Sequence, residues 1–212
     1  MPANDRYDVT LADLQPAGTD VLHPEARLDG LEIRGDASGG DATGARLVEC
    51  RLVDVVADDA RWASLRLVGC QVDGLRASEV GLSACVWREV AIEGGRVGAL
   101  VAPGARLTRV RLRGVRVDYL NLRGAELVDV RLEDCEVGGL DLLGARVTRL
   151  DLPGSRVGAV TVREAALRDV DLSEGRLGPV DGVRNLSGAT VSHGQLLDLA
   201  PALADSLGIR LA

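Results

Sequence analysis

Few side chains in this chain have the type and spacing that chemistry needs. The 212 residues contain two histidines and four cysteines. His23 and His193 lie near opposite ends, and neither is part of a recognisable nucleophile, phosphate-binding or metal motif. The paired carboxylates at residues 58–59 and 133–134 fall among turn-forming residues, where solvated acids are common. The sequence therefore predicts a protein that is not an enzyme and has no catalytic, metal-binding or cofactor-binding residues.

One column of charged side chains does recur with a fixed spacing. At steps of twenty residues the chain places Arg76, Arg96, Arg116, Glu136, Arg156 and Arg176. Stacked arginines repel one another unless they are screened or paired, and Asp118 and Glu79 lie near enough in sequence to pair with some of them. Two interpretations stay open, a solvated and partly paired ladder or a strip that binds an acidic partner. We take the five arginines as the candidate interaction surface.

A second periodicity shows which elements position these side chains. Every fifth residue from Ala37 to Leu177 is apolar, and most residues two positions before these are also small or apolar. A step of five advances about 500° on an α-helix and changes face in a continuous strand, so neither element alone buries the ladder. Each repeat must then be a short extended piece, pointing in, out and in, followed by a corner rich in glycine and acidic residues.

The size of the recurring small residues gives the number of sides in one coil. Alanines recur every twenty residues at 105, 125, 145 and 165, next to a larger column at 120, 140, 160 and 180. A coil of twenty residues keeps each column uniform, whereas a coil of fifteen would mix small and large residues in every column. Four sides of five residues therefore fit best, and about seven coils at roughly 4.8 Å each make a rod about 35 Å long.

These residues resemble the pentapeptide-repeat family. The segments Leu-Asn-Leu-Arg-Gly-Ala at 120–125 and Val-Asp-Leu-Ser at 170–173 are typical of it. The resemblance implies an all-β solenoid, a right-handed four-sided β-helix, with the two ladders inside. The chain departs from the family in having no phenylalanine and in often placing arginine before the central residue of a repeat.

The segments outside the ladder are predicted to cover the ends of the solenoid. We divide the chain into an irregular N-terminal segment or cap (1–34), the repeat β-helix (35–182) and a C-terminal helical cap (183–212). Ser192 and Gln195 have the spacing of a capping box, and a helix is expected over about 195–207. Its apolar stripe is expected to pack on the last coil or to form a homodimer, and comprises Leu196, Leu199, Leu203 and Leu207.

Composition limits the compartment and the partner. No signal peptide or apolar stretch of membrane-spanning length is found, which favours the cytoplasm. The net charge of −7 argues against nucleic acid as a direct ligand. All four cysteines occupy inward positions and are expected to be buried free thiols: Cys50, Cys70, Cys85 and Cys135.

Two functions follow as expectations. The first is a non-catalytic scaffold that presents a rigid surface to an unidentified protein partner. The alternative, implied by the family resemblance, is a DNA-mimicking protein that binds and protects or regulates DNA gyrase or topoisomerase. Mimicry requires a continuous acidic surface, and arginine interrupts every predicted face of this chain.

Overall fold

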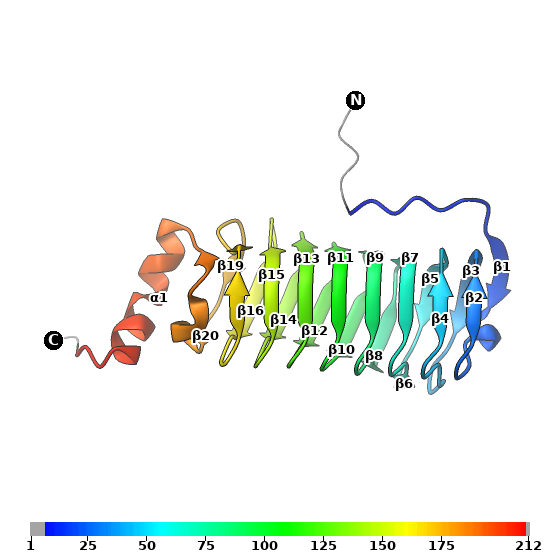
Figure 1. The fold of residues 1–212 in the computed structure, drawn as a ribbon, viewed down its shortest axis with the longest axis horizontal. Helices are drawn as coiled ribbons and strands as arrows, with labels where there is room; N and C mark the ends of the chain where they lie inside the picture. The colour runs from blue at the N-terminus through cyan, green and yellow to red at the C-terminus, as the bar shows by residue number, and fades with distance from the viewer. Residues whose placement is uncertain (1–6, 211–212) are drawn as a thin grey trace, which may run out of the picture.

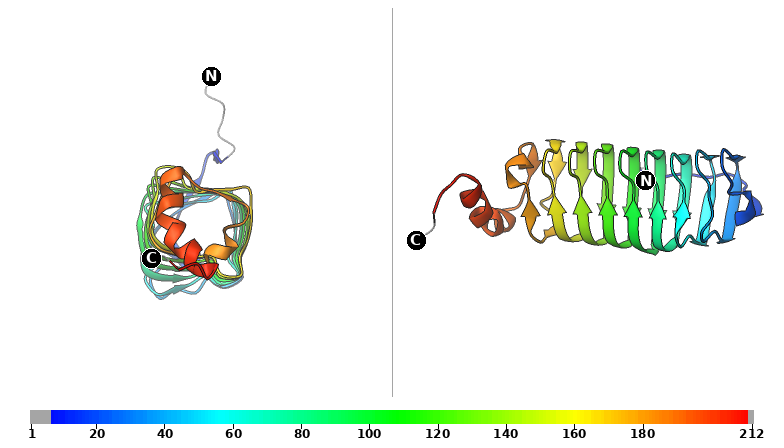
Figure 2. Two further views of the ribbon diagram at one scale, coloured as in Figure 1. Left: turned by 90° about the vertical axis from the view of Figure 1, so that its left-hand side faces the viewer. Right: turned by 90° about the horizontal axis from the view of Figure 1, so that it is seen from below.

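The chain winds into a four-sided parallel β-solenoid with one α-helix at its C-terminal end (Figures 1 and 2). The computed structural model describes residues 7–210 and contains about nine turns of the coil. Its strands are β1 (Gln15–Gly18), β2 (Arg27–Asp29), β3 (Leu31–Asp36), β4 (Arg46–Val48), β5 (Arg51–Val56), β6 (Ala60–Arg61), β7 (Arg66–Asp73), β8 (Arg76–Gly81), β9 (Val86–Glu93), β10 (Arg96–Val101), β11 (Arg106–Arg113), β12 (Arg116–Asn121), β13 (Glu126–Glu133), β14 (Glu136–Asp141), β15 (Arg146–Asp151), β16 (Arg156–Thr161), β17 (Ala166–Arg168), β18 (Val170–Asp171), β19 (Arg176–Leu177), β20 (Val180–Asp181) and β21 (Ala189–Thr190). The helical segments are η1 (Thr19–Val21), η2 (Val183–Leu186) and α1 (His193–Ser206).

Strand pairing confirms the coil of twenty residues. Through the middle of the solenoid each residue pairs with the one twenty positions later, as Val97 does with Val117 and Leu107 with Leu127. All the pairings are parallel, so each face of the coil is one column of stacked strands. Parallel sheets need both faces protected, and here the inner face closes on the apolar ladder.

Burial confirms the inward and outward positions. The central residues from Ala37 to Val162 are all buried, and Leu132 is only 2% exposed. The ladder loosens towards its end, where Leu167 and Leu177 are partly exposed. The residues two positions before the ladder are buried as well, and Ser155, which replaces an apolar residue there, donates its hydroxyl to the Leu132 carbonyl at 2.9 Å.

Three of the four corners in each regular coil contain a residue in the left-handed region, two positions after the central residue. Gly104 (φ 66°), Asp129 (φ 55°) and Gly114 (φ 61°) are examples. The fourth corner, which lies within β10, β12, β14 and β16, has none. A Cβ atom at Gly138 or Gly158 in this corner would collide with a backbone carbonyl of the preceding coil. At these glycines the backbone itself therefore forms the edge of the solenoid, with no side chain covering it.

The solenoid begins earlier and ends later than the repeat pattern predicts. β1 pairs with β3 and β2 with β4, so the coil starts at Gln15 rather than at residue 35. At the other end β21 pairs with β18, so the coil extends to Thr190 rather than 182. The partners here lie 16 or 19 residues apart instead of 20, as with Ala17 and Ile33, or Val170 and Ala189. These shortened coils interrupt the five-residue step, which is why the pattern did not reveal them.

The N-terminal segment does more than cover an end. The η1 residue Val21 packs against the core at this end, as a cap would, and Ala17 does so from β1 within the first coil. Residues 7–14 instead leave β1 and run back along one side of the solenoid towards its middle (Figures 1 and 2). Long-range side-chain contacts, which carry no periodic signal, hold this segment in place.

The predicted C-terminal helix is present with its capping box. The Ser192 hydroxyl accepts from the Gln195 backbone N–H at 3.2 Å, and the Ser192 N–H donates to the Gln195 side chain at 2.7 Å. The helix continues through Pro201 as one element and ends before Gly208, which has a φ of 75°. It lies across the end of the last coil (Figure 2).

Candidate functional site

The five predicted arginines lie together on one outer side of the solenoid. Register pairing stacks Arg76, Arg96 and Arg116 in adjacent coils, and the column continues through Glu136 to Arg156 and Arg176. All five arginine side chains are exposed. We call this column the arginine side. Five intervals of about 4.8 Å make it about 24 Å long.

Acidic residues pair with only part of the arginine side. Arg116 Nη1 lies 3.3 Å from Glu136 Oε2, and Arg96 Nη2 lies 3.9 Å from Asp118 Oδ2. All four side chains are more than half exposed, so these pairs contribute little to stability. Within residues 7–210, the other three arginines of the column form no ion pair, and Glu79 is not a partner of any of them. The column therefore keeps uncompensated positive charge.

A tyrosine next to this side was not identified from the sequence. Tyr119 is 37% exposed and donates its hydroxyl to Asp141 Oδ2 at 2.7 Å. Arg123 Nε donates to the same oxygen at 2.6 Å, and the Leu143 N–H donates to Oδ1 at 3.0 Å. The only signal in the sequence was the rarity of tyrosine, which occurs twice in the chain. The contact joins positions 22 residues apart, and because 22 is not a multiple of five, the five-residue step does not predict it.

The Asp141 carboxylate is the most buried acid on the outer surface of the described chain, at 3% exposed. Burial by itself raises its pKa, but the hydrogen bonds from Tyr119, Leu143 and Arg123 outweigh this effect and the pKa is lowered. The hydrogen bond to Asp141 in turn raises the pKa of Tyr119. The cluster is thus an ionised carboxylate saturated with donors. That arrangement orients Tyr119 and leaves no acid available for proton transfer.

A different corner carries a ladder of alternating charge. At steps of twenty the chain places Glu89, Arg109, Asp129, Arg149 and Asp169, all with positive φ. Arg149 contacts Asp129 through two hydrogen bonds of 2.6 and 3.0 Å, and Arg109 pairs with Glu89. The alternation of sign was readable in the sequence at this step. Both arginines of this corner are paired with acids, in contrast with the arginine side.

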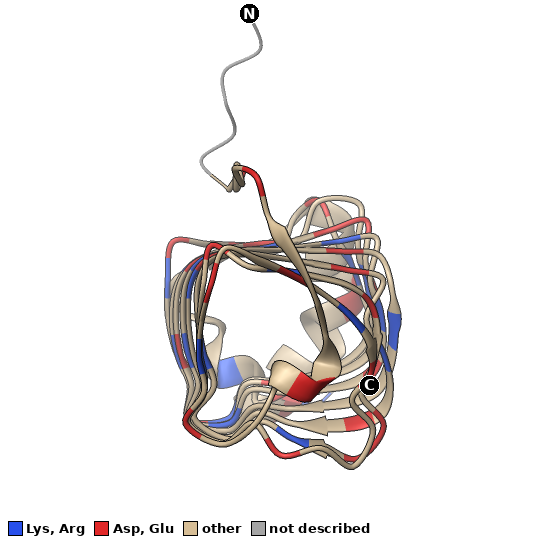
Figure 3. Cartoon of the chain, turned by 90° about the vertical axis from the view of Figure 1, so that its right-hand side faces the viewer, with Lys and Arg blue, Asp and Glu red and all other residues tan. Residues whose placement is uncertain are grey.

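Charges of both signs surround the coil. Viewed along the axis, basic and acidic positions alternate around its circumference (Figure 3). The duplex-like surface that DNA mimicry requires is an unbroken acidic one. The arginine side interrupts such a surface along about 24 Å of the rod.

The residues considered for catalysis are not gathered into a site. His23 Nδ1 lies 3.1 Å from the Pro24 carbonyl, and His193 is the first residue of α1 at the opposite end of the solenoid. Among residues 7–210, no three His, Cys, Asp or Glu side chains come close enough to hold a metal ion. The helices of this same range include none long and apolar enough to cross a membrane.

The four cysteines are buried free thiols, as expected. Burial raises the pKa of Cys70 and of Cys85 to about 12, and it also raises the pKa of Cys50 and Cys135. The thiolate is the nucleophilic form of cysteine, and these environments disfavour it. The cysteines therefore serve as small core residues.

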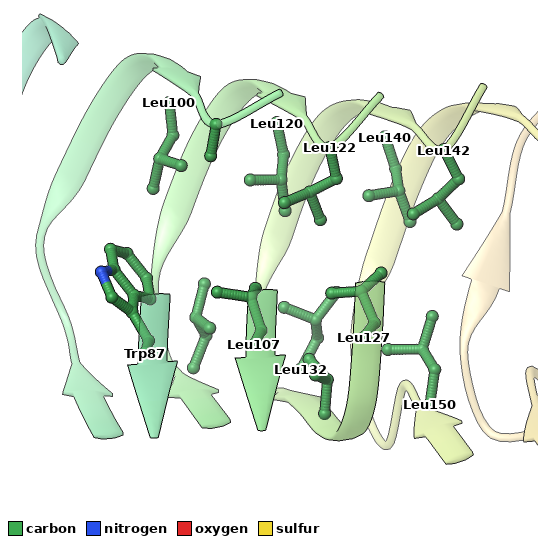
Figure 4. A pocket seen from close by; sticks show the side chains of 13 residues that line it. Trp87, Leu100, Leu107, Leu120, Leu122, Leu127, Leu132, Leu140, Leu142 and Leu150 are labelled. Carbon is green, nitrogen blue, oxygen red and sulfur yellow. The ribbon is translucent and has the colours of Figure 1, made fainter. Parts of the chain in front are cut away.

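The interior contains cavities lined only by apolar side chains. One of about 20 Å³ lies beside Trp87, among leucines such as Leu107 and Leu132 (Figure 4). A second, of similar volume, lies between Trp62 and Trp87. The indole N–H groups of these two tryptophans have no hydrogen-bond partner in the described chain. A buried water needs two to four polar partners, so we interpret these spaces as packing voids rather than ligand sites.

The predicted cap contacts of α1 differ in burial. Leu199 is 7% exposed and Leu203 is partly buried, whereas Leu196 and Leu207 are 47% and 67% exposed. Gln195 Nε2 donates to the carbonyls of Leu172 and Gly175, at 2.7 and 2.8 Å. Of the four predicted leucines, Leu199 lies with Leu177 and Val180 at the end of the solenoid, together with a glutamine that the apolar pattern missed.

Comparison with solved structures finds five chains that match this one. No protein-family model matches the chain, and no curated protein matches it. Among solved structures, the chain is similar to HetL, a pentapeptide repeat protein involved in heterocyst differentiation regulation from the cyanobacterium Nostoc sp. strain PCC 7120. The two are 18% identical, the alignment covers 79% of this chain and 90% of HetL, and the TM-score is 0.25. The five-residue ladder, the coil of twenty residues and the parallel four-sided sheet give this chain the fold of the pentapeptide-repeat proteins.

Proposed function

We propose that the chain is a non-catalytic scaffold that docks an acidic protein partner on its arginine side. The observation that carries this proposal is the column of five exposed arginines in register, three of which form no ion pair within residues 7–210. Arginine side chains with uncompensated charge steer the approach of an acidic surface and bind carboxylates through two parallel hydrogen bonds.

The edge beside the column supports docking of a flat surface. Residues 98–99, 138–139 and 158–159 are all glycine or alanine, at the corner that the strands cross without a left-handed residue. Tyr119 projects from this edge and is held by Asp141. Tyrosine and arginine are the residue types that most often dominate binding energy at protein interfaces. A pre-oriented tyrosine next to a row of arginines therefore fits a protein partner.

Charge reversal on two opposite sides tests the proposal. The Arg76→Glu/Arg156→Glu variant changes the arginine side, and the Arg46→Glu/Arg146→Glu variant makes the same change of charge on the opposite side. We expect partners crosslinked to the wild-type chain in its host to be recovered equally with the second variant. With the first, their recovery should fall at least about tenfold. Equal recovery with both variants would contradict docking on the arginine side. DNA gyrase subunits are probed in the same samples, since mimicry predicts them among the partners.

Two further features of the proposed function concern assembly and location. Leu196, Leu197 and Leu207 are exposed on α1, which supports a homodimer through the C-terminal segment as an alternative to a monomer. Four buried free thiols and no disulfide among the described residues support the reducing environment of the cytoplasm. Neither feature points to a bound cofactor or to nucleic acid as a direct ligand.

A further inference from the structure

The N-terminal segment that lies along the solenoid makes specific contacts with it, three of which define its path. We call residues 7–14 the strap. Tyr7 is 2% exposed, and the Arg131 guanidinium carbon lies 6.0 Å from the centre of its ring. Asp8 Oδ1 accepts a hydrogen bond from Arg111 Nη1 at 3.0 Å, across 103 residues of sequence. The Val9 carbonyl accepts from Gln71 Nε2 at 2.7 Å. The strap is thus held by one ring, one carboxylate and one backbone group.

The three contacted side chains belong to one outward column of the solenoid. Register pairing aligns Gln71 with Ala91, Ala91 with Arg111 and Arg111 with Arg131. We call these four residues the strap groove. It lies on the side of the coil that precedes the arginine side in chain order. Ala91 is only 3% exposed although it points outward, so the neighbouring side chains and the strap close over it.

The groove is organised by the solenoid itself. Arg111 Nη2 donates to Glu93 Oε1 at 2.8 Å, and Glu93 lies at the end of β9, in the adjacent coil. This second bond orients the guanidinium whether or not Asp8 is present. Arg111 is 9% exposed; burial lowers its pKa, but the hydrogen bonds that it donates to Glu93 and Asp8 outweigh this effect and the pKa is raised. The site is therefore a preformed, charged receptor for a carboxylate.

The rest of the strap is loosely held. Among the described residues, no hydrogen bond joins residues 10–14 to the solenoid, and Thr10, Ala12 and Asp13 are exposed. A space of about 590 Å³ lies beneath this stretch, bordered by Glu32, Arg51 and Gln71. A segment with few buried contacts and an open space below it opens at a low free-energy cost. The strap behaves as a short peptide tethered to its own binding site.

We propose that the strap groove is a peptide-binding site for an extended segment of a partner protein that carries an aromatic residue followed by an acidic residue. The aromatic ring takes the place of Tyr7 against Arg131, and the acid takes the place of Asp8 on Arg111. Gln71 binds the next backbone carbonyl, which requires no particular side chain. The proposal is independent of the arginine side and extends the scaffold to a second surface.

The tether makes the strap a built-in competitor. A short linker keeps the strap at an effective concentration in the millimolar range. An outside segment at a lower concentration must therefore bind the groove more tightly than the strap does in order to displace it. The space beneath residues 10–14 offers a partner contacts that the strap does not make. The site therefore selects segments that fill this space as well as supplying the aromatic and acidic residues.

Trans-binding of the strap sequence to the full-length chain tests the proposal. The probe is a fluorescein-labelled peptide with the sequence of residues 7–14, measured by fluorescence anisotropy. In the full-length Tyr7→Ala/Asp8→Ala variant the tethered competitor is weakened, so we expect the peptide to bind at least about tenfold more tightly than to the wild-type chain. The matched control is Asp13→Ala, an exposed acid of the strap, which should behave as wild type. Equal binding to the double variant and the wild type would overturn the proposal.

A second comparison locates the binding site. Adding Arg111→Gln or Gln71→Ala to the Tyr7→Ala/Asp8→Ala chain should weaken peptide binding, by at least about tenfold for Arg111→Gln. Adding Arg113→Gln, at an exposed corner of the same coil, should leave binding unchanged. The thermal melting curve of each variant shows that it is folded. If neither groove substitution weakens binding in a folded chain, the groove is not the site and the proposal fails.

Discussion

At the scale of single residues, Asp141 shows how an outward position becomes buried. It occupies the middle of an in-out-in repeat, where most side chains are at least partly exposed, yet the Tyr119 hydroxyl and the Arg123 guanidinium cover it. An ionised carboxylate at such a place is stable only because donors saturate it. The lowered pKa of Asp141 expresses this balance.

The lowered pKa of Asp141 predicts that its contribution to the free energy of unfolding depends on pH. Because the folded pKa of Asp141 is lowered, its contribution to stability is present above its unfolded pKa of about 3.9 and is lost as pH falls through the folded value. Asp141→Asn should therefore lower the free energy of unfolding by about 1–3 kcal/mol at pH 7, and by less at pH 3. Urea unfolding followed by circular dichroism measures both.

The control is Asp181→Asn. Asp181 is an exposed acid of the same column and pairs with Arg163 at 3.0 Å, with both side chains more than half exposed. This pair should contribute less than about 1 kcal/mol. An effect of Asp141→Asn that is equal at pH 7 and pH 3 would show that the charge of Asp141 does not contribute to stability.

At the scale of elements, α1 is attached to the last coil mainly through one face. Gln195 donates to the backbone carbonyls of Leu172 and Gly175 in the coil, and Leu199 lines a space at the end of the solenoid with Leu177 and Val180. A four-sided coil has open strand edges at its end, and a helix covers these without presenting a new edge. The capping box at Ser192 fixes where the helix begins.

Two leucines of α1 that differ in burial test this attachment. Leu199→Ala removes a buried side chain and should destabilise the docked helix by roughly 2 kcal/mol, with faster amide exchange along α1. Leu196→Ala removes an exposed side chain of the same size and should change exchange little. Hydrogen exchange followed by mass spectrometry compares the two. Equal protection in both variants would mean that Leu199 does not hold the helix on the coil.

At the scale of the whole molecule, the chain is a rod whose two ends are closed by different means. Val21 of η1 packs against the core at the first coil, and α1 covers the last. Such caps are required because an uncapped solenoid presents apolar side chains and unpaired strand edges to other copies. The net charge of −7 adds a general repulsion between copies.

Removing the C-terminal cap tests this view of the rod. Deleting residues 193–212 uncovers the end of the core around Leu177 and Val180, and each such apolar side chain accounts for roughly 1.5–3 kcal/mol of burial at most. We expect the truncated chain to associate end to end, with a mass that rises with concentration in size-exclusion chromatography with light scattering. An unchanged mass with unchanged melting would show that α1 is not needed as a cap and serves an outside partner.

The coil itself was predictable because it depends on local periodicity. The five-residue step determines which side chains point inward, and the sizes of residues twenty positions apart determine the number of sides, so Leu132 and Arg116 were placed correctly. The same step placed the five arginines in one column. Prediction failed at Gln15–Arg34 and at the last coils, where pairs 16 or 19 residues apart break the step.

Only the tertiary structure decided which non-repeating residues meet. Asp8 and Arg111 are 103 residues apart, and no period relates them; they meet because a flexible segment gains more from a ring, a carboxylate and a carbonyl contact than from remaining in water. Tyr119 and Asp141 lie in adjacent coils of the repeat, but their contact runs diagonally, since Tyr119 is in register with Gly139, so the five-residue step does not identify it. A repeat specifies its own stacking at every coil, whereas the contacts of a strap or a cap depend on the summed free energy of a few groups brought together by the finished fold.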